Sequence, residues 1–154
     1  METTNKTRPS WDETFFELCE IVAQRSKDIS TKVGSVIIGP DREVRSTGYN
    51  SFPRGIDDDV DKRQERPYKY YWFEHAERNA IYNAARVGTP LKGCTLYVPL
   101  MPCADCARAI IQAGIIEVVL TSLEVPEKWS SWAESMECSR QMFEEAGIIV
   151  REKR

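Results

Sequence analysis

The apolar residues in the N-terminal part of the chain follow first a helical pattern and then a strand-like pattern. Apolar side chains recur every three to four positions between Phe15 and Val22, which predicts a helix over residues 11–27. The β-branched run at 33–39 is bounded by glycines and predicts a strand, and 43–49 is predicted to return beside it as a hairpin. A loop is expected over 50–66.

The remainder of the chain alternates helix-like segments with short apolar strands. Helices are predicted over 74–86, 102–113 and 131–146, and strands over 94–98, 116–120 and 148–150. Helices that alternate with short apolar strands indicate a mixed sheet covered on both faces. The expected fold class is therefore α/β, with a five-stranded mixed sheet in a three-layer α/β/α arrangement.

Length, charge and hydropathy limit the class of protein. The 154 residues suit one domain, predicted over 11–154, preceded by a polar tail at 1–10 that is prone to disorder. The 21 Lys and Arg against 24 Asp and Glu argue against a grip on long nucleic acids, which rests on cations that contact phosphate. No apolar run is long enough for a membrane span or a secretory signal, so a cytoplasmic protein without a membrane partner is expected.

One histidine and a cysteine pair carry the candidate chemistry. His75 is the only histidine in the sequence, and Cys103 and Cys106 form a Cys-x-x-Cys pair. Two thiolates and one imidazole make a three-ligand zinc set, and a fourth position left to water is typical of a catalytic site. The spacing brings both sulfurs to the first turn of a helix, where the dipole favours thiolate. Glu77 is the candidate proton shuttle if a helix begins at the site, because residues two apart within a helix point about 200° apart.

The same residues also have plainer interpretations. A lone histidine often satisfies a helix end, and a Cys-x-x-Cys pair occurs in redox dithiols and in four-cysteine structural zinc sites. A redox dithiol does not explain the accompanying His75 and Glu77. A structural site needs a second cysteine pair, whereas Cys19, Cys94 and Cys138 are scattered singly and are expected to be small buried hydrophobic side chains.

An aromatic cluster and an acidic run precede His75 in the sequence. Most of the aromatic residues at 68–73 are expected to pack in the core or a subunit interface, and the last two or three to border the pocket. The acidic run at 57–61 is interpreted as a solvated loop paired with nearby cations rather than as a metal site. The run is flanked by Arg54, Lys62, Arg63 and Arg66, and the three arginines leave open a contact with a nucleotide phosphate from a neighbouring subunit.

His-Ala-Glu at 75–77 followed by Pro-Cys-Ala-Asp-Cys at 102–106 matches the H-x-E and P-C-x-x-C pattern of zinc-dependent nucleobase deaminases. The chain resembles the cytidine and deoxycytidylate deaminase superfamily, and most closely its deoxycytidylate branch. The resemblance is carried by the stretches 25–28, 32–34, 48–50, 75–81, 93–98 and 102–115. Because these stretches occur in order over most of the chain, they are more specific than the zinc pattern alone.

The resemblance implies a cytidine deaminase-like fold and the hydrolytic deamination of dCMP to dUMP and ammonia, which feeds thymidylate synthesis. His75, Cys103 and Cys106 would hold one zinc ion per subunit. Glu77 would take a proton from the water, protonate N3 of cytosine and later deliver a proton to the leaving ammonia. The nucleophile would attack C4 of the base.

The resemblance also suggests how the substrate is held. Asn50 resembles the residue that contacts the sugar, and the backbone of Ala76 lies where the base edge is read. The phosphate is expected near Ser26 and Lys27. A homo-oligomer, often a hexamer, and the effectors dCTP and dTTP are typical of the family. Ser51 replaces the glycine that usually follows Gly-Tyr-Asn near the effector site, which puts this regulation in doubt.

Three other functions share the zinc pattern. A deaminase of another free nucleoside or nucleotide, such as cytidine, guanine or a modified cytosine, differs only in phosphate recognition. A tRNA adenosine deaminase or other polynucleotide deaminase needs a basic surface, which the acidic balance disfavours. A zinc-stabilised binding module without turnover has no use for a shuttle carboxylate, so the presence of Glu77 argues against it.

Overall fold

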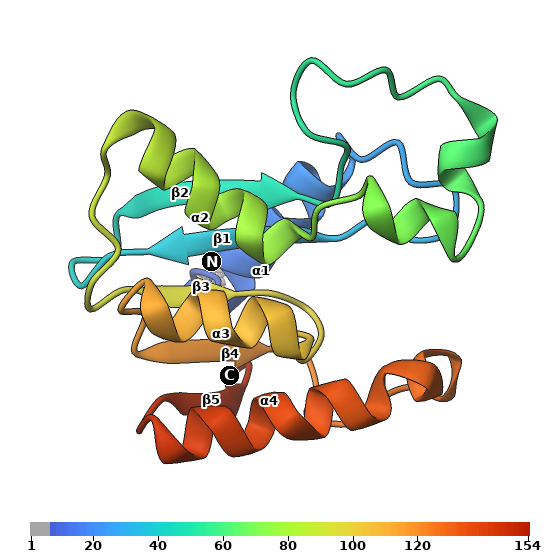
Figure 1. Ribbon diagram of the computed structural model, residues 1–154. Coiled ribbons are helices and arrows are strands. Elements are labelled where there is room, and N and C mark those ends of the chain that lie inside the picture. Colours follow the sequence, from blue (N-terminus) through green and yellow to red (C-terminus); the bar gives the residue numbers. More distant parts are fainter. Residues whose placement is uncertain (1–6) are drawn as a thin grey trace, which may run out of the picture.

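The centre of the structure is a five-stranded mixed sheet with strand order β2-β1-β3-β4-β5 (Figure 1). This computed structural model describes residues 7–154. The strands are β1 (Gly34–Ile38), β2 (Val44–Tyr49), β3 (Thr95–Tyr97), β4 (Glu117–Leu120) and β5 (Ile149–Glu152). β1 is antiparallel to both β2 and β3, whereas the β3–β4 and β4–β5 pairs are parallel. The sheet confirms the predicted fold class.

Helices cover both faces of this sheet (Figure 1). They are α1 (Trp11–Ala23), α2 (Ala76–Val87), α3 (Ala104–Gln112) and α4 (Ala133–Glu145). α1 packs on one face, and the other three helices pack on the opposite face. Within the described part of the chain, no helix has both the length and the apolar character needed to cross a membrane.

Alternating side chains of each strand supply the two cores. Val36 and Tyr97 pack with Phe15 of α1, whereas their neighbours Ile37 and Leu96 belong to the core beneath α2 and α3. All five side chains are at most 3% exposed. Because successive strand residues point to opposite faces, apolar residues at consecutive positions require helices on both sides of the sheet.

Some boundaries differ from the predicted ones, and hydrogen bonds explain the earlier end of α1. α1 ends at Ala23 rather than at residue 27, because the amides of Arg25 and Ser26 bond to carbonyls three residues earlier and the Ser26 hydroxyl donates to the Asn50 carbonyl (2.7 Å). A 3-10 segment, η3 (Glu127–Trp132), precedes α4 where the helix was expected to start at residue 131. The predicted loop at 50–66 contains the 3-10 turn η1 (Asp61–Gln64), and η2 (Tyr68–Tyr71) follows it.

The predicted polar tail lies partly outside the described residues, which begin at residue 7. Its last residue, Ser10, is the N-cap of α1. The Ser10 hydroxyl accepts from the Glu13 amide (3.1 Å), and the Glu13 carboxylate accepts from the Ser10 amide (2.9 Å). This capping box satisfies two amides that a helix start leaves unpaired, and so it fixes where α1 begins.

A buried carboxylate, Asp12, joins the first helix to the end of the chain. It is 4% exposed. It accepts hydrogen bonds from the Tyr97 hydroxyl (2.7 Å), the Arg151 guanidinium (2.7 and 3.1 Å) and the Arg154 amide (2.8 Å). Burial opposes the ionisation of Asp12, but these bonds and the Arg151 charge outweigh it and lower its pKa to about 2.

We expect Asp12→Asn to lower the free energy of unfolding by about 2 kcal/mol at pH 7, because the folded state stabilises the ionised carboxylate. The pKa of Asp12 is lower in the folded chain than its ordinary value of 3.8. The contribution is therefore present above pH 4 and is lost as the pH falls from about 4 to about 2. Urea unfolding at pH 7 and at pH 3 measures it, with the exposed Asp41→Asn as the control. Equal stability of Asp12→Asn and the wild type at pH 7 would contradict the assignment.

Candidate functional site

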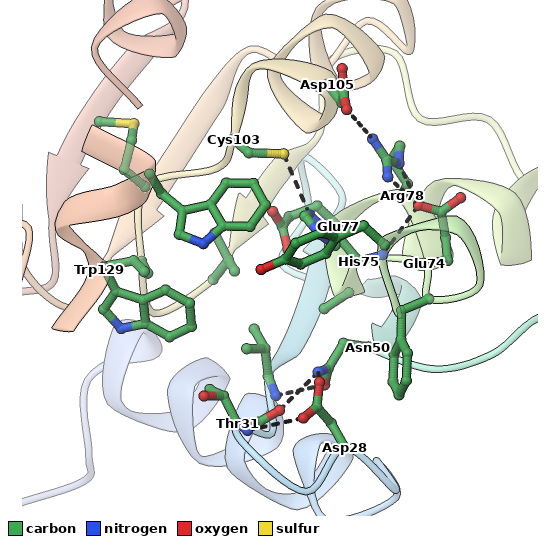
Figure 2. Close-up of a pocket in the computed structure, with 18 of the residues that line it drawn as sticks. Asp28, Thr31, Asn50, Glu74, His75, Glu77, Arg78, Cys103, Asp105 and Trp129 are labelled. Carbon is green, nitrogen blue, oxygen red and sulfur yellow. Dashed lines mark hydrogen bonds and ion pairs between the residues drawn. The ribbon is translucent and has the colours of Figure 1, made fainter. Parts of the chain in front are cut away.

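The candidate site lies where two helices begin next to each other. His75 is the N-cap residue of α2, and Cys103 is the N-cap residue of α3, so both side chains leave the chain just before a helix starts. Cys106 is in the first turn of α3. Figure 2 shows the His75 ring directed at Cys103. The His75 Nδ1 atom lies 3.4 Å from the Cys103 Sγ and 3.5 Å from the Cys106 Sγ.

These separations match a tetrahedral zinc site. Zinc bonds of about 2.0–2.1 Å to nitrogen and about 2.3 Å to sulfur, at tetrahedral angles, separate the two ligand atoms by about 3.5 Å. The three candidate ligand atoms lie within 4.8 Å of one another. The donor set of one imidazole and two thiolates is also one that zinc prefers. His75, Cys103 and Cys106 therefore fit a zinc ion without rearrangement.

The Cys103 and Cys106 thiols shift each other's pKa in opposite directions. The hydrogen bond from the Cys106 thiol lowers the pKa of Cys103, and the bond with the His75 ring lowers it further against the effect of burial. The same hydrogen bond, together with burial, raises the pKa of Cys106. One thiolate is thus already favoured at the cluster, and binding of a metal releases the remaining thiol proton.

Glu77 faces the same cavity as the cluster because α2 starts at Ala76 (Figure 2). His75 precedes the helix and Glu77 is in its first turn, which meets the geometric condition set by the sequence. The Glu77 side chain is buried, with 6% of the residue exposed. Burial raises the pKa of Glu77, and the nearby His75 partly offsets the effect. A raised pKa suits a carboxyl group that accepts and returns protons near neutral pH.

The cavity of about 210 Å³ has two chemically different ends. His75, Glu77 and Cys103 lie at one end, and Asp28 and Asn50 lie at the other (Figure 2). A planar base and an attached sugar need such a succession of surfaces, with the reacting group at one end and polar contacts at the other. We refer to it as the catalytic cavity.

Asn50 lines the catalytic cavity, and its amide is already hydrogen-bonded. The Nδ2 atom donates to Asp28 (3.2 Å) and to the Thr31 carbonyl (2.9 Å), while Oδ1 accepts from the Val33 amide (2.8 Å). One lone pair of Oδ1 remains for another donor. A sugar hydroxyl is such a donor, and contact of Asn50 with the sugar stays a prediction.

The other predicted substrate residues have different surroundings. Ala76 lines the catalytic cavity and is 1% exposed, and its carbonyl accepts from the Ser35 hydroxyl (2.9 Å). Neither Ser26 nor Lys27 lines this cavity. The Ser26 hydroxyl is buried in its bond to the Asn50 carbonyl, and Lys27 pairs with Asp58 (2.9 Å) beside a second cavity. The structure does not bring these two predicted phosphate contacts to the metal cluster.

Two tryptophans of the catalytic cavity were not found from the sequence. Trp129 and Trp132 belong to η3 and line the cavity, and the Trp132 ring centroid lies 5.9 Å from that of His75 at an interplanar angle of 70°. Residues three apart in a 3-10 helix share one side. The spacing of the two tryptophans was therefore an available signal, but a helix was predicted only from residue 131, which left Trp129 in no element and placed Trp132 in an α-helix.

Of the aromatic residues expected at the pocket, only part of the prediction is correct. Phe73 lines the catalytic cavity, and so does Tyr70. Tyr71 is 85% exposed, and Trp72 packs instead against the Arg63 guanidinium (3.8 Å to the ring centroid). The difference arises because η2 turns once every three residues, so adjacent aromatic side chains point in different directions.

The predictions for the remaining cysteines and for the acidic run at 57–61 agree with the structure in all but one case. Cys19 and Cys94 are buried as predicted, but Cys138 is exposed, because its position on α4 faces away from the core. In the acidic run, Asp58 pairs with Lys27 and is flanked by exposed carboxylates, in agreement with a locally paired loop. The interpretation of Cys138 as a buried side chain is thus wrong.

An ion-pair chain holds the two helix starts together (Figure 2). Arg78 of α2 contacts Glu74 (2.5 Å), which lies just before His75, and Asp105 of α3 (3.7 Å). Arg78 is largely buried, with 18% of its side chain exposed. Because Asp105 lies between the two cysteines, this chain of charges fixes the histidine side of the cluster relative to the cysteine side.

The comparisons with known proteins agree with this geometry. The family model described as "Cytidine and deoxycytidylate deaminase zinc-binding region" matches residues 9–122, which include the whole metal cluster. The chain belongs to this family. Its cofactor is zinc, since the family is defined by a zinc-binding region and the cluster of His75, Cys103 and Cys106 fits that ion.

Individual relatives cover most of this deaminase. An Aliivibrio fischeri protein named "Uncharacterized deaminase in luxG 3'region" is 41% identical over 140 residues, which are 91% of each chain. Human deoxycytidylate deaminase is 38% identical over 146 residues, which are 92% of this chain and 78% of the human one. The dCMP deaminase of cyanophage S-TIM5, solved with dCMP and dUMP, has a TM-score of 0.74 at 22% identity and shares the fold over 96% of this chain and 99% of its own.

Proposed function

We propose that this deaminase hydrolyses dCMP to dUMP and ammonia and thereby supplies dUMP for thymidylate synthesis. The observation that carries the proposal is the cluster of His75, Cys103 and Cys106 with the buried carboxyl of Glu77 in the same cavity. The choice of dCMP is supported by the human relative, whose name states that activity and whose sequence aligns with 92% of this chain.

The described side chains have distinct roles in this reaction. When bound, zinc supplies a water that ionises near neutral pH. Glu77 is placed to accept a proton from the attacking water and pass it to N3 of the base, and then to accept the proton of the hydroxyl added at C4 and pass it to the departing amine. Trp132 and Phe73 line the cavity and exclude bulk water from the base. Exclusion of water strengthens the electrostatic interactions that favour these proton transfers. The amide of Ala76 at the start of α2 contacts the base edge, and Asn50 Oδ1 accepts from the sugar hydroxyl.

The same proposal includes regulation by dCTP and dTTP at the second cavity. Four basic residues line this cavity: Arg25, Lys27, Arg54 and Arg86. Tyr49 and Ser51 line it as well, so the Gly-Tyr-Asn stretch that typifies the family's effector region lies beside it. A triphosphate needs several cations, and this cavity supplies them. The Ser51 side chain occupies space in the second cavity that a glycine would leave open, and it thereby changes the affinity for an effector.

A homo-oligomer in the cytoplasm completes the proposal, with a hexamer as the family resemblance suggests. Large apolar side chains remain exposed in one chain, among them Ile29 (78%), Tyr71 (85%) and Val87 (76%). Contact with further subunits would remove such surface from water. Thiolate ligands also remain reduced in the cytoplasm, which supports that location.

We expect the zinc-loaded protein to deaminate dCMP faster than deoxycytidine, CMP or dCTP, because the proposed site accepts a deoxyribose with one 5′-phosphate. Ultraviolet absorbance measured in parallel on the four substrates tests this, and addition of dCTP or dTTP to the dCMP reaction tests the proposed regulation. Absence of turnover on all four, with zinc bound, would contradict the proposed function and favour a purine or polynucleotide substrate.

A further inference from the structure

We propose that Arg66 binds the 5′-phosphate of the substrate and so distinguishes the nucleotide from the nucleoside. The inference rests on the proposed function and names the contact that would set its substrate class. It also differs from the expectation based on resemblance, which placed the phosphate near Ser26 and Lys27.

The charges around the catalytic cavity single out Arg66. Apart from His75, the cavity is lined by three basic side chains, those of Arg66, Lys69 and Arg78. Lys69 forms a buried ion pair with Asp28 (2.7 Å), in which both side chains are at most 7% exposed. Arg78 is held by the two carboxylates described above. Among the residues that the structure describes, Arg66 has no ion-pair partner.

This difference matters because recruiting a paired cation is costly. Lys69 would have to leave Asp28 unpaired in a buried environment, where an uncompensated charge is strongly destabilising. Arg66 is exposed and can engage an incoming anion without breaking an existing ion pair. Its planar guanidinium also matches two phosphate oxygens at once.

The backbone around Arg66 is fixed beside the cavity. The Glu65 carbonyl accepts from the Lys69 amide (2.7 Å), and the Pro67 carbonyl accepts from the Tyr70 amide (3.1 Å). Lys69 and Tyr70 both line the catalytic cavity, so these bonds anchor the carbonyl groups of the two residues that flank Arg66 to residues of the cavity wall. A long side chain on an anchored backbone can reach a ligand without movement of the loop.

The orientation that the substrate must take in the cavity agrees with a phosphate contact at Arg66. C4 of the base has to lie beside Glu77 and the metal cluster, so the sugar and its 5′ substituent extend toward the opposite end. Figure 2 places Asp28 and Asn50 at that end. Lys69 compensates the charge of Asp28 and thereby reduces its repulsion of a phosphate. Lys27, in contrast, is paired with Asp58 (2.9 Å) and lines the other cavity.

Arg66→Gln tests the inference in the zinc-loaded, full-length protein. We expect kcat/KM for dCMP to fall by about 10- to 100-fold, the range of one charge-assisted hydrogen-bonded contact, and kcat/KM for deoxycytidine to stay unchanged. Calorimetric affinity for dUMP is expected to fall by a similar factor, with no change for deoxyuridine. Arg140→Gln is the matched control, since Arg140 is an exposed arginine of α4 outside both cavities.

The outcomes separate this inference from the proposed function. An equal loss for dCMP and deoxycytidine in Arg66→Gln, or a loss of the phosphate preference in Lys27→Gln instead, overturns the assignment. A wild-type protein that accepts neither substrate contradicts the proposed function. In that case a lower affinity of Arg66→Gln for dUMP but not for deoxyuridine still supports the role of Arg66, and unchanged affinities overturn it.

Discussion

Glu77→Gln is expected to reduce kcat for dCMP by about 10²–10⁴-fold while the protein keeps its fold and its zinc. The amide has the shape of the carboxyl group but cannot accept a proton from water or deliver one to the base. Glu77 is not one of the three candidate ligands, so the cluster of His75, Cys103 and Cys106 stays complete. Glu77 is buried and forms no ion pair with the described residues, so removal of its charge is not expected to destabilise the fold.

Steady-state kinetics on dCMP, zinc content after denaturation and the thermal unfolding midpoint measure this result together. Glu20→Gln is the matched control, because Glu20 is an exposed residue of α1 on the other side of the sheet. Normal turnover by Glu77→Gln would show that another group moves the protons. Loss of zinc from the same variant would show that Glu77 acts on the metal centre rather than on the substrate.

Cys106→Ser is expected to abolish both zinc retention and turnover. Only three side chains of the described cluster are available as ligands, and Cys106 is completely buried among them. Loss of a direct ligand exceeds the effect of losing an outer partner of a ligand, which already costs about 10- to 100-fold in metal affinity or activity. A serine hydroxyl stays protonated at neutral pH and does not replace a thiolate.

Cys138→Ser supplies the control, because Cys138 is exposed on α4 and away from the cluster. Purified variants are compared by zinc content and by the rate at which a colorimetric chelator removes zinc, so that the result does not depend on activity. Full zinc content in Cys106→Ser would place the metal elsewhere in the chain. Loss of zinc from Cys138→Ser would mean that the measurement reports general destabilisation.

The features that could be predicted from the sequence are those that depend on residues close together along the chain. The order of helices and strands follows from apolar periodicity, and the zinc ligands follow from short spacings around His75 and Cys103. The orientation of Glu77 was conditional on where α2 begins, and the structure supplies that start at Ala76. Periodicity and short motifs were sufficient for these features.

Features that depend on distant residues were not predicted. No sequence pattern indicates that the Ser26 hydroxyl donates to the Asn50 carbonyl, 24 positions away. The Asp12–Arg151 pair spans 139 positions and gives no local pattern. Cys138 has an apolar side chain on a helix whose exposed face could be identified only once α4 was packed. Partners of this kind become visible when the sheet brings the segments together.

Because β3 and β4 are parallel, the metal ligands and the residues that shape the pocket wall can come from two different segments of the chain. The segment after β3 carries Cys103 and Cys106, and the segment after β4 carries Trp129 and Trp132, so both reach the same edge of the sheet. They are neighbours in space but independent in sequence. Mutations at 121–132 can therefore reshape the pocket wall while the metal ligands and the proton shuttle stay intact. Such an arrangement lets natural selection change the accepted base without having to rebuild the reaction.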